Sequence, residues 1–125
     1  MIERKQLVGS WLLAKHGCYD LEGRYHASGA GRRGQLIYSP DGSMGVLITT
    51  KPEPVHLKDI IAYSGSFTIE GDKVFHHIKI CPNPKRLNTT EVRLVELRGN
   101  ELVLTTEPDD EGHYEIIWHR KSAEQ

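Results

Sequence analysis

One histidine of the chain lies where its side chain could do chemistry inside a folded core. In the segment KVFHHIKI, His76 alternates with Val74 and Ile78, whereas its neighbour His77 alternates with Lys79. Because successive side chains of a strand point to opposite faces, we expect His76 to face the interior and His77 the solvent. A buried imidazole needs a hydrogen-bond partner, and desolvation lowers its pKa. His76 is therefore either a core histidine bonded to a neighbouring tyrosine, or a polar anchor or general base in a cavity.

The histidines and cysteines do not predict a metal site. His76 and His77 are adjacent on one strand, so they point to opposite sides and cannot hold one ion together. No His-x-x-x-His spacing occurs among the other five histidines: His16, His26, His56, His113 and His119. Cys18 and Cys81 form no Cys-x-x-Cys pair and are expected to be free thiols. We therefore expect no metal and no cofactor.

Four large side chains are candidates for the lining of an apolar pocket. Tyr63 and Phe67 share one face of the segment AYSGSFTIEG, and Tyr38 and Met44 flank the turn at residues 40–42. In a pocket, the tyrosine hydroxyls would be its few directed polar groups. The alternative is that these side chains simply fill a small barrel.

Arg93 is a further candidate, but its direction is ambiguous. In EVRLVEL it alternates with Val95 and Leu97, while Val92 and Leu94 occupy the opposite face. Pointing inward, Arg93 could pair with the carboxylate of a ligand. Pointing outward, it would be a solvated charge, which is the commoner fate of an arginine.

Short segments of alternating polarity, separated by turns, dominate the chain and predict about eight strands with short links. Helix is expected only before Gly9 and around residues 55–61. An open sheet of eight antiparallel strands would leave two exposed edges, and closure into a barrel removes them. We therefore predict an all-β fold with one domain over residues 1–125. Its architecture would be an eight-stranded antiparallel up-and-down barrel, with nine or ten strands as alternatives and a sandwich as the second choice.

Two segments between strands are predicted to be long loops at the mouth of the barrel. Residues 18–34 are rich in glycine and are interpreted as a mobile loop, with a short strand around residues 24–26 as an option. Arg32 and Arg33 in this stretch are followed by no Lys-Ser/Thr pair, so a phosphate-binding loop is rejected. Together with residues 50–61, this loop would gate access to the interior.

The composition excludes several classes of partner. The 125 residues include 16 basic and 17 acidic ones, for a formal net charge of -1. Such a balance gives no large field to attract nucleic acid or a membrane surface. The first five residues are mostly polar and charged and contain no apolar signal-type stretch, which predicts a cytoplasmic protein. The composition does not distinguish a monomer from a homodimer.

The pattern around Gly9, Ser10 and Trp11 resembles the Gly-x-Trp motif of the lipocalins. The wider chain is similar to the small bacterial lipocalin-like domain family, a calycin-type group. The similar segments are GSW (9–11), RGQLIYSPDGSM (33–44), AYSGSFTIEGDKVFHHIKICPNP (62–84), EVRLVEL (91–97), ELVLTT (101–106) and IIWHR (116–120). The resemblance implies a barrel closed at one end by Trp11, with Arg120 of the last strand packed over it. Trp118 is expected to pack in the same structure.

These observations lead to three hypotheses of function. The first is binding of a small, largely apolar molecule in the barrel, with His76 and Arg93 orienting its polar end. The second is an enzyme on the same scaffold, a cyclase, isomerase or hydratase that uses His76 as acid and base. The third is a filled barrel that acts through its surface or through dimer contacts.

Overall fold

A computed structural model describes residues 1–28, 31–51, 53 and 56–122. Among these residues, nine strands form one antiparallel sheet, accompanied by one short helix and one 3-10 turn. In chain order the elements are α1 (Arg4–Leu7), β1 (Gly9–Tyr19), β2 (Tyr25–Ala27), β3 (Arg33–Tyr38), β4 (Ser43–Thr49), η1 (Leu57–Asp59), β5 (Ile60–Glu70), β6 (Lys73–Ile80), β7 (Thr90–Arg98), β8 (Glu101–Thr106) and β9 (His113–Arg120). Neither helix of this described part is long and apolar enough to cross a membrane.

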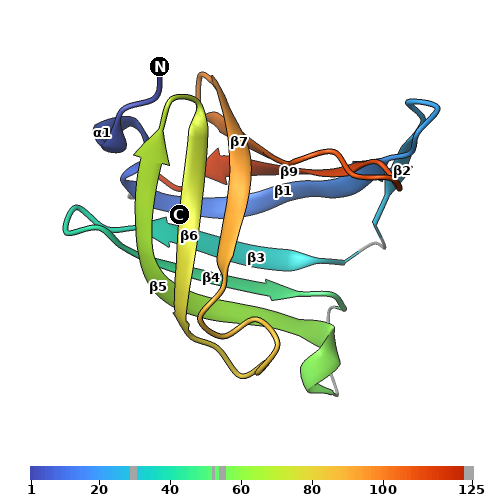
Figure 1. The fold of residues 1–125 in the computed structure, drawn as a ribbon, viewed down its shortest axis with the longest axis horizontal. Coiled ribbons are helices and arrows are strands. Elements are labelled where there is room, and N and C mark those ends of the chain that lie inside the picture. The colour runs from blue at the N-terminus through green and yellow to red at the C-terminus, as the bar shows by residue number, and fades with distance from the viewer. Residues whose placement is uncertain (29–30, 52, 54–55, 123–125) are drawn as a thin grey trace.

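Eight of the strands close into an up-and-down barrel (Figure 1). Strands β3 to β9 pair in chain order, and β1 pairs with β3 on one side and with β9 on the other. The ninth strand, β2, lies outside this ring and pairs with the last residues of β1. The predicted eight-stranded barrel with an optional ninth strand is confirmed.

The prediction of one long loop over residues 18–34 was wrong. Strand β1 continues to Tyr19, and the chain turns back so that β2 pairs with it. The close approach is possible because Gly17 has no side chain, and a Cβ at this position would collide with the ring of Tyr25. The short strand expected near residues 24–26 is confirmed, and residues 29 and 30 lie outside the described part of the chain.

The helix expected around residues 55–61 is reduced to a single 3-10 turn, η1. Residues 60 and 61 already belong to β5, where they pair with Thr49 and Ile48 of β4. Sheet pairing therefore overrides the helical spacing of the apolar residues in this segment. Residue 55 lies outside the described residues. The other expected helix, before Gly9, is confirmed as α1.

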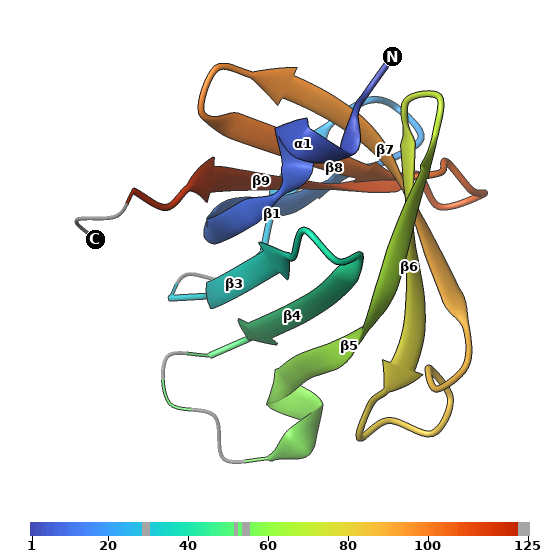
Figure 2. The ribbon, with the colours of Figure 1, turned by 90° about the vertical axis from the view of Figure 1, so that its left-hand side faces the viewer.

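One end of the barrel is closed by α1, which lies across it where β1 begins (Figure 2). Trp11 is fully buried there, and its indole Nε1–H donates to the carbonyl of Leu7 at 2.9 Å. Arg120 stacks on the indole, with its Cζ atom 4.1 Å from the ring centroid. The same guanidinium donates to the carbonyls of Val8 and Gln6. Trp11 and Arg120 thus contact each other at the end of the barrel where the resemblance places them.

Gly9 is required by this closure for two reasons. Its φ of +133° is a backbone conformation that residues with a side chain rarely adopt. A Cβ at this position would also lie only 2.7 Å from Nη1 of Arg120. The glycine two residues before Trp11 thus leaves room for the arginine that covers the tryptophan.

Candidate functional site

The half of the barrel away from α1 contains a cavity of about 360 Å³. Its rim lies where β4 and β8 end and where β3, β5 and β9 begin. Seven apolar residues line it: Leu36, Val46, Ile48, Ile61, Leu104, Ile116 and Trp118. Nine polar or aromatic residues complete the lining: His16, Arg32, Thr50, Tyr63, His76, Arg86, Arg93, Thr106 and Tyr114. A cavity of this size does not support the hypothesis of a filled barrel.

His76 lies at the inner wall of the cavity and is 2 % exposed. Its Nε2 is 2.6 Å from the hydroxyl of Tyr38, and its Nδ1 is 2.9 Å from the hydroxyl of Tyr63. Burial, with a smaller contribution from the charge of Arg93, lowers the pKa of His76 to about 3. The imidazole is therefore neutral at physiological pH. The prediction of a buried histidine bonded to a neighbouring tyrosine is confirmed, with two tyrosines instead of one.

Three of the four predicted lining residues lie elsewhere. Tyr63 lines the cavity, but Tyr38, Met44 and Phe67 are packed in the core below it. Tyr38, at the end of β3, is paired with Gly9 at the start of β1. Tyr38 and the side chains packed beside it therefore belong to the closed end of the barrel. The alternation of a strand distinguishes inside from outside but carries no information on depth along the barrel axis.

Arg93 faces the cavity, which is the inward one of the two orientations that the sequence left open. Its side chain is 15 % exposed, and Nη1 donates to the carbonyl of Val92 at 2.9 Å. Val95, two residues further along β7, is buried on the same face, whereas Val92 and Leu94 on the other face are half-buried. The outer face of β7 is also partly covered and therefore carries apolar residues. With apolar residues on both faces, the sequence could not decide which way Arg93 points.

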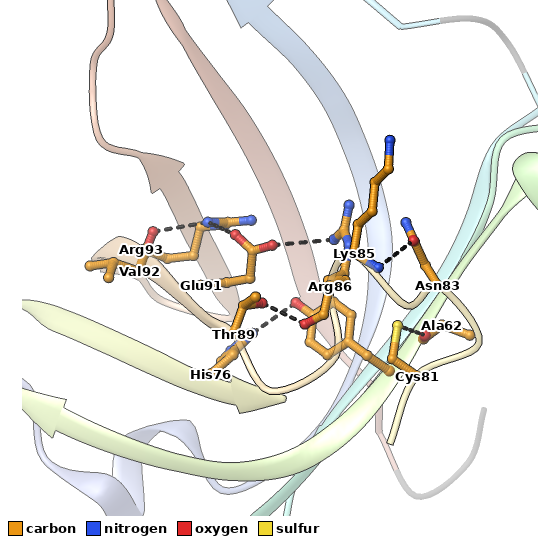
Figure 3. A network of polar contacts seen from close by, with 11 residues as sticks. Ala62, His76, Cys81, Asn83, Lys85, Arg86, Thr89, Glu91, Val92 and Arg93 are labelled. Atoms are coloured by element: carbon orange, nitrogen blue, oxygen red, sulfur yellow. Dashed lines mark hydrogen bonds and ion pairs between the residues drawn. The ribbon is translucent and has the colours of Figure 1, made fainter. Parts of the chain in front are cut away.

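Arg93 belongs to a small ionic network at the rim (Figure 3). Glu91 lies between Arg93, at 3.4 Å, and Arg86 of the β6–β7 loop, at 3.5 Å. The Arg86 guanidinium also lies over the ring of Tyr63, with its Cζ atom 5.8 Å from the centroid. One carboxylate between two guanidinium groups leaves the network with a net positive charge.

Arg32 is a third arginine of the cavity wall and was not among the predicted site residues. It directly precedes β3 and continues the inward-facing series of Gly34, Leu36 and Tyr38. Its Nε atom is buried and has no hydrogen-bond partner among the described residues. Extending the alternation of β3 backwards by one step would have identified it. Arg86 lies in a loop, where no such signal exists.

His16 reaches the cavity because β1 contains an irregularity. The pairing of β1 with β9 shifts register between Leu13 and Lys15, which changes the face that the following residues present. The Nδ1 atom of His16 lies 2.7 Å from the hydroxyl of Ser28. Burial, and then the charges of Arg32 and Arg93, lower the pKa of His16 to about 4. This histidine is thus neutral at physiological pH and adds no charge to the cavity.

The electrostatic character of the lining follows from these residues. Three arginines and no carboxylate are among the residues that line the cavity. Glu91, which is not part of the lining, forms ion pairs with two of the arginines, Arg86 and Arg93. No group of three or more His, Cys, Asp or Glu side chains in the described part of the chain is arranged to hold a metal ion. The arrangement can hold an apolar body and offers guanidinium donors to an anion.

The buried imidazole makes stability depend on pH. The folded state keeps His76 neutral down to a pKa of about 3, whereas the unfolded chain binds a proton below 6.5. The contribution of His76 to the free energy of unfolding is therefore constant above pH 6.5. Below that pH the contribution falls by about 1.4 kcal/mol per pH unit, because the unfolded chain binds a proton that the folded chain does not. Urea unfolding of the wild type and of His76→Gln between about pH 7 and pH 5 measures this effect. We expect the free energy of unfolding to depend less steeply on pH in His76→Gln than in the wild type. An equal dependence on pH in both proteins would contradict a His76 side chain that is buried in its neutral form.

Comparisons with known proteins support the fold. No family model matches the chain, and no curated protein matches it. An uncharacterized protein from Bacteroides eggerthii DSM 20697 is 13% identical, with a TM-score of 0.55 over 92% of this chain and 99% of that one. A mutant of the fluorescent protein UnaG is 15% identical, with a TM-score of 0.53 over 96% and 99%. A redesigned β-barrel is also 15% identical, with a TM-score of 0.53 over 95% of each chain.

At these identities the likeness concerns the fold alone. The closed antiparallel ring of eight strands and the structural neighbours fit a β-barrel fold of the lipocalin-like or calycin-like kind. A de novo designed fluorescence-activating β-barrel shares it, with a TM-score of 0.50 and 11% identity.

Proposed function

We propose that the protein binds a small amphipathic anion in the barrel cavity. The apolar body of the ligand would lie against the aliphatic side chains and Trp118, and its anionic group would contact the arginines of the wall. The observation that carries the proposal is a cavity with seven apolar residues, three arginines and no carboxylate in its lining. Eight-stranded barrels of this kind are wide enough to hold one small ligand.

The two parts of the lining would contribute different energies. Burial of apolar ligand surface contributes about 25 cal/mol per Å², which provides most of the affinity. Guanidinium groups match a carboxylate in shape and charge, and the hydrogen bonds between them are stronger than neutral ones. Arg32 has an Nε–H without a partner among the described residues, and Arg93 shares Glu91 with Arg86. An anionic ligand would supply the negative charge that these groups lack.

An enzyme that uses His76 as general base has weaker support. Both ring nitrogens of His76 are hydrogen-bonded to tyrosines, so neither has a free lone pair for a substrate proton. No other observation favours catalysis over binding. The gating role of residues 18–34 and 50–61 remains a prediction, since residues 29, 30, 52, 54 and 55 lie outside the described part of the chain.

The proposal is tested with probes that differ only in their head group. Anilinonaphthalene sulfonate, an anion that fluoresces in apolar surroundings, would report occupation of the cavity. We expect decanoate to displace it, and nonylammonium, with the same alkyl tail and the opposite charge, to do so at least about tenfold more weakly. Higher salt should weaken decanoate binding. Equal displacement by both compounds, or no binding of the anionic probe, would contradict the proposal.

A further inference from the structure

The contact of His76 with two tyrosines determines which of their hydroxyls is free to bind a ligand. Tyr38 and Tyr63 lie on different sides of the imidazole, 2.6 Å from Nε2 and 2.9 Å from Nδ1. Their surroundings differ. Tyr38 is 1 % exposed and packs against Phe67 in the closed half of the barrel, whereas Tyr63 lines the cavity.

A neutral imidazole has one N–H donor and one lone pair. One of the two tyrosines must therefore donate its proton to His76, and the other must accept the N–H of the ring. The tyrosine that accepts keeps its own hydroxyl proton and needs a second partner for it. The two possible tautomers of His76 differ in which tyrosine this is.

The burial of Tyr38 decides between the tautomers. In the described part of the chain, the hydroxyl of Tyr38 has no hydrogen-bond partner other than His76. If it accepted the N–H of His76, its own proton would be left without a partner in the core, which is unfavourable. If Tyr38 donates to Nε2, its proton is used. The Nδ1–H of His76 then donates to Tyr63, and the Tyr63 proton is available to the cavity.

The two distances agree with a hydrogen bond from Tyr38 to His76 and one from His76 to Tyr63. A hydroxyl that donates gives shorter contacts than an N–H group, which prefers about 2.9 to 3.0 Å. The contact of Tyr38 with Nε2 is the shorter one, and that of Tyr63 with Nδ1 has the length of an N–H···O bond. Burial also raises the pKa of Tyr63 to about 12, so its hydroxyl keeps its proton at physiological pH.

We propose that Tyr63 donates a hydrogen bond to an oxygen of the bound molecule, and that the chain from Tyr38 through His76 fixes it in this donor role. The inference rests on the proposed function, and it narrows the ligand to an amphipathic anion that presents a carboxylate or carbonyl oxygen to this wall. A ligand that presents an O–H or N–H donor there would meet the Tyr63 proton and bind less well. Arg93, whose charge acts on both His76 and Tyr63, would share the recognition of the acceptor.

The tautomer can be measured without any ligand. Heteronuclear NMR of the histidine rings distinguishes a protonated Nδ1 from a protonated Nε2. Burial lowers the pKa of His16 to about 4 and that of His76 to about 3, so both rings are neutral at pH 6. A His16→Gln variant removes one of these two ring signals and so identifies that of His76. A protonated Nδ1 is expected, and a protonated Nε2 would overturn the inference.

Binding then tests the donor role itself. We expect Tyr63→Phe to weaken decanoate binding about tenfold, because it removes one hydrogen bond to a charged acceptor. Tyr19→Phe, which removes a hydroxyl outside the cavity, serves as the matched control and should bind like the wild type. If the wild type binds decanoate and Tyr63→Phe binds equally well, this inference fails and the proposed function stands. If the wild type does not bind decanoate, the proposed function fails, and this inference fails with it.

Discussion

Replacing Trp11 by alanine should reduce the free energy of unfolding by about 3–5 kcal/mol, the usual cost of deleting a buried large aromatic side chain. The indole is fully buried, and its loss removes the hydrogen bond to Leu7 and the surface on which Arg120 stacks. The helix α1 would then lack the buried side chain to which Leu7 is hydrogen-bonded at this end of the barrel. Urea unfolding followed by far-ultraviolet circular dichroism measures the change.

The control for this variant lies one residue away. Leu12 is 36 % exposed on the outer face of the same strand, so Leu12→Ala should change the stability by less than about 1 kcal/mol. Trp11→Phe keeps much of the packing, so its loss of stability should lie between those of Trp11→Ala and Leu12→Ala. Equal effects of Trp11→Ala and Leu12→Ala would contradict the closure of the barrel by Trp11.

Removing the charge of Arg93 or Arg32 should weaken decanoate binding about 10- to 100-fold, the usual range for a hydrogen bond between charged groups. The variants Arg93→Gln and Arg32→Gln keep polar side chains in the wall but lack the guanidinium. Both residues line the cavity, and the lining contains no carboxylate. Isothermal titration calorimetry with decanoate measures the loss.

The neighbour of Arg32 provides a matched control. Arg33 is exposed on the opposite face of β3, so Arg33→Gln changes the net charge equally without touching the cavity. It should bind decanoate like the wild type. The stability of the unliganded Arg32→Gln protein should be unchanged or higher, because fewer like charges then face each other. Equal losses of affinity for Arg32→Gln and Arg33→Gln would contradict a direct contact.

The sequence predicted which side chains face inward wherever a strand is regular and has one polar face. His76 is the clearest example, because Val74 and Ile78 bracket it and Lys79 marks the other face as exposed. The closure of the barrel followed from the resemblance that Gly9, Trp11 and Arg120 carry. The orientation of His76 depends only on its neighbours in the sequence. The closure depends on a motif that can be recognised without knowing how the strands pair.

The rest of the site depends on information that local patterns lack. Tyr38, Met44 and Phe67 were expected in the cavity because alternation gives no depth along the barrel axis. In hindsight the strand directions hold that information, since the end of β3 must lie beside the start of β1 in an up-and-down barrel. His16 reaches the cavity through an irregular pairing, and Arg86 through a loop, and neither has a signature in the sequence.

The most direct test of the central claim is where the ligand binds. Methyl NMR spectra of the protein, recorded with and without decanoate, can separate the cavity from the outer face of the barrel. Ile48, Leu104 and Ile116 line the cavity, whereas Ile37, Leu47 and Ile80 are exposed outside it, at 42 %, 51 % and 71 %. The account predicts that decanoate shifts the methyl signals of the first three and leaves those of the second three in place. Shifts confined to Ile37, Leu47 and Ile80 would show that the ligand lies on the outer surface and would contradict the account.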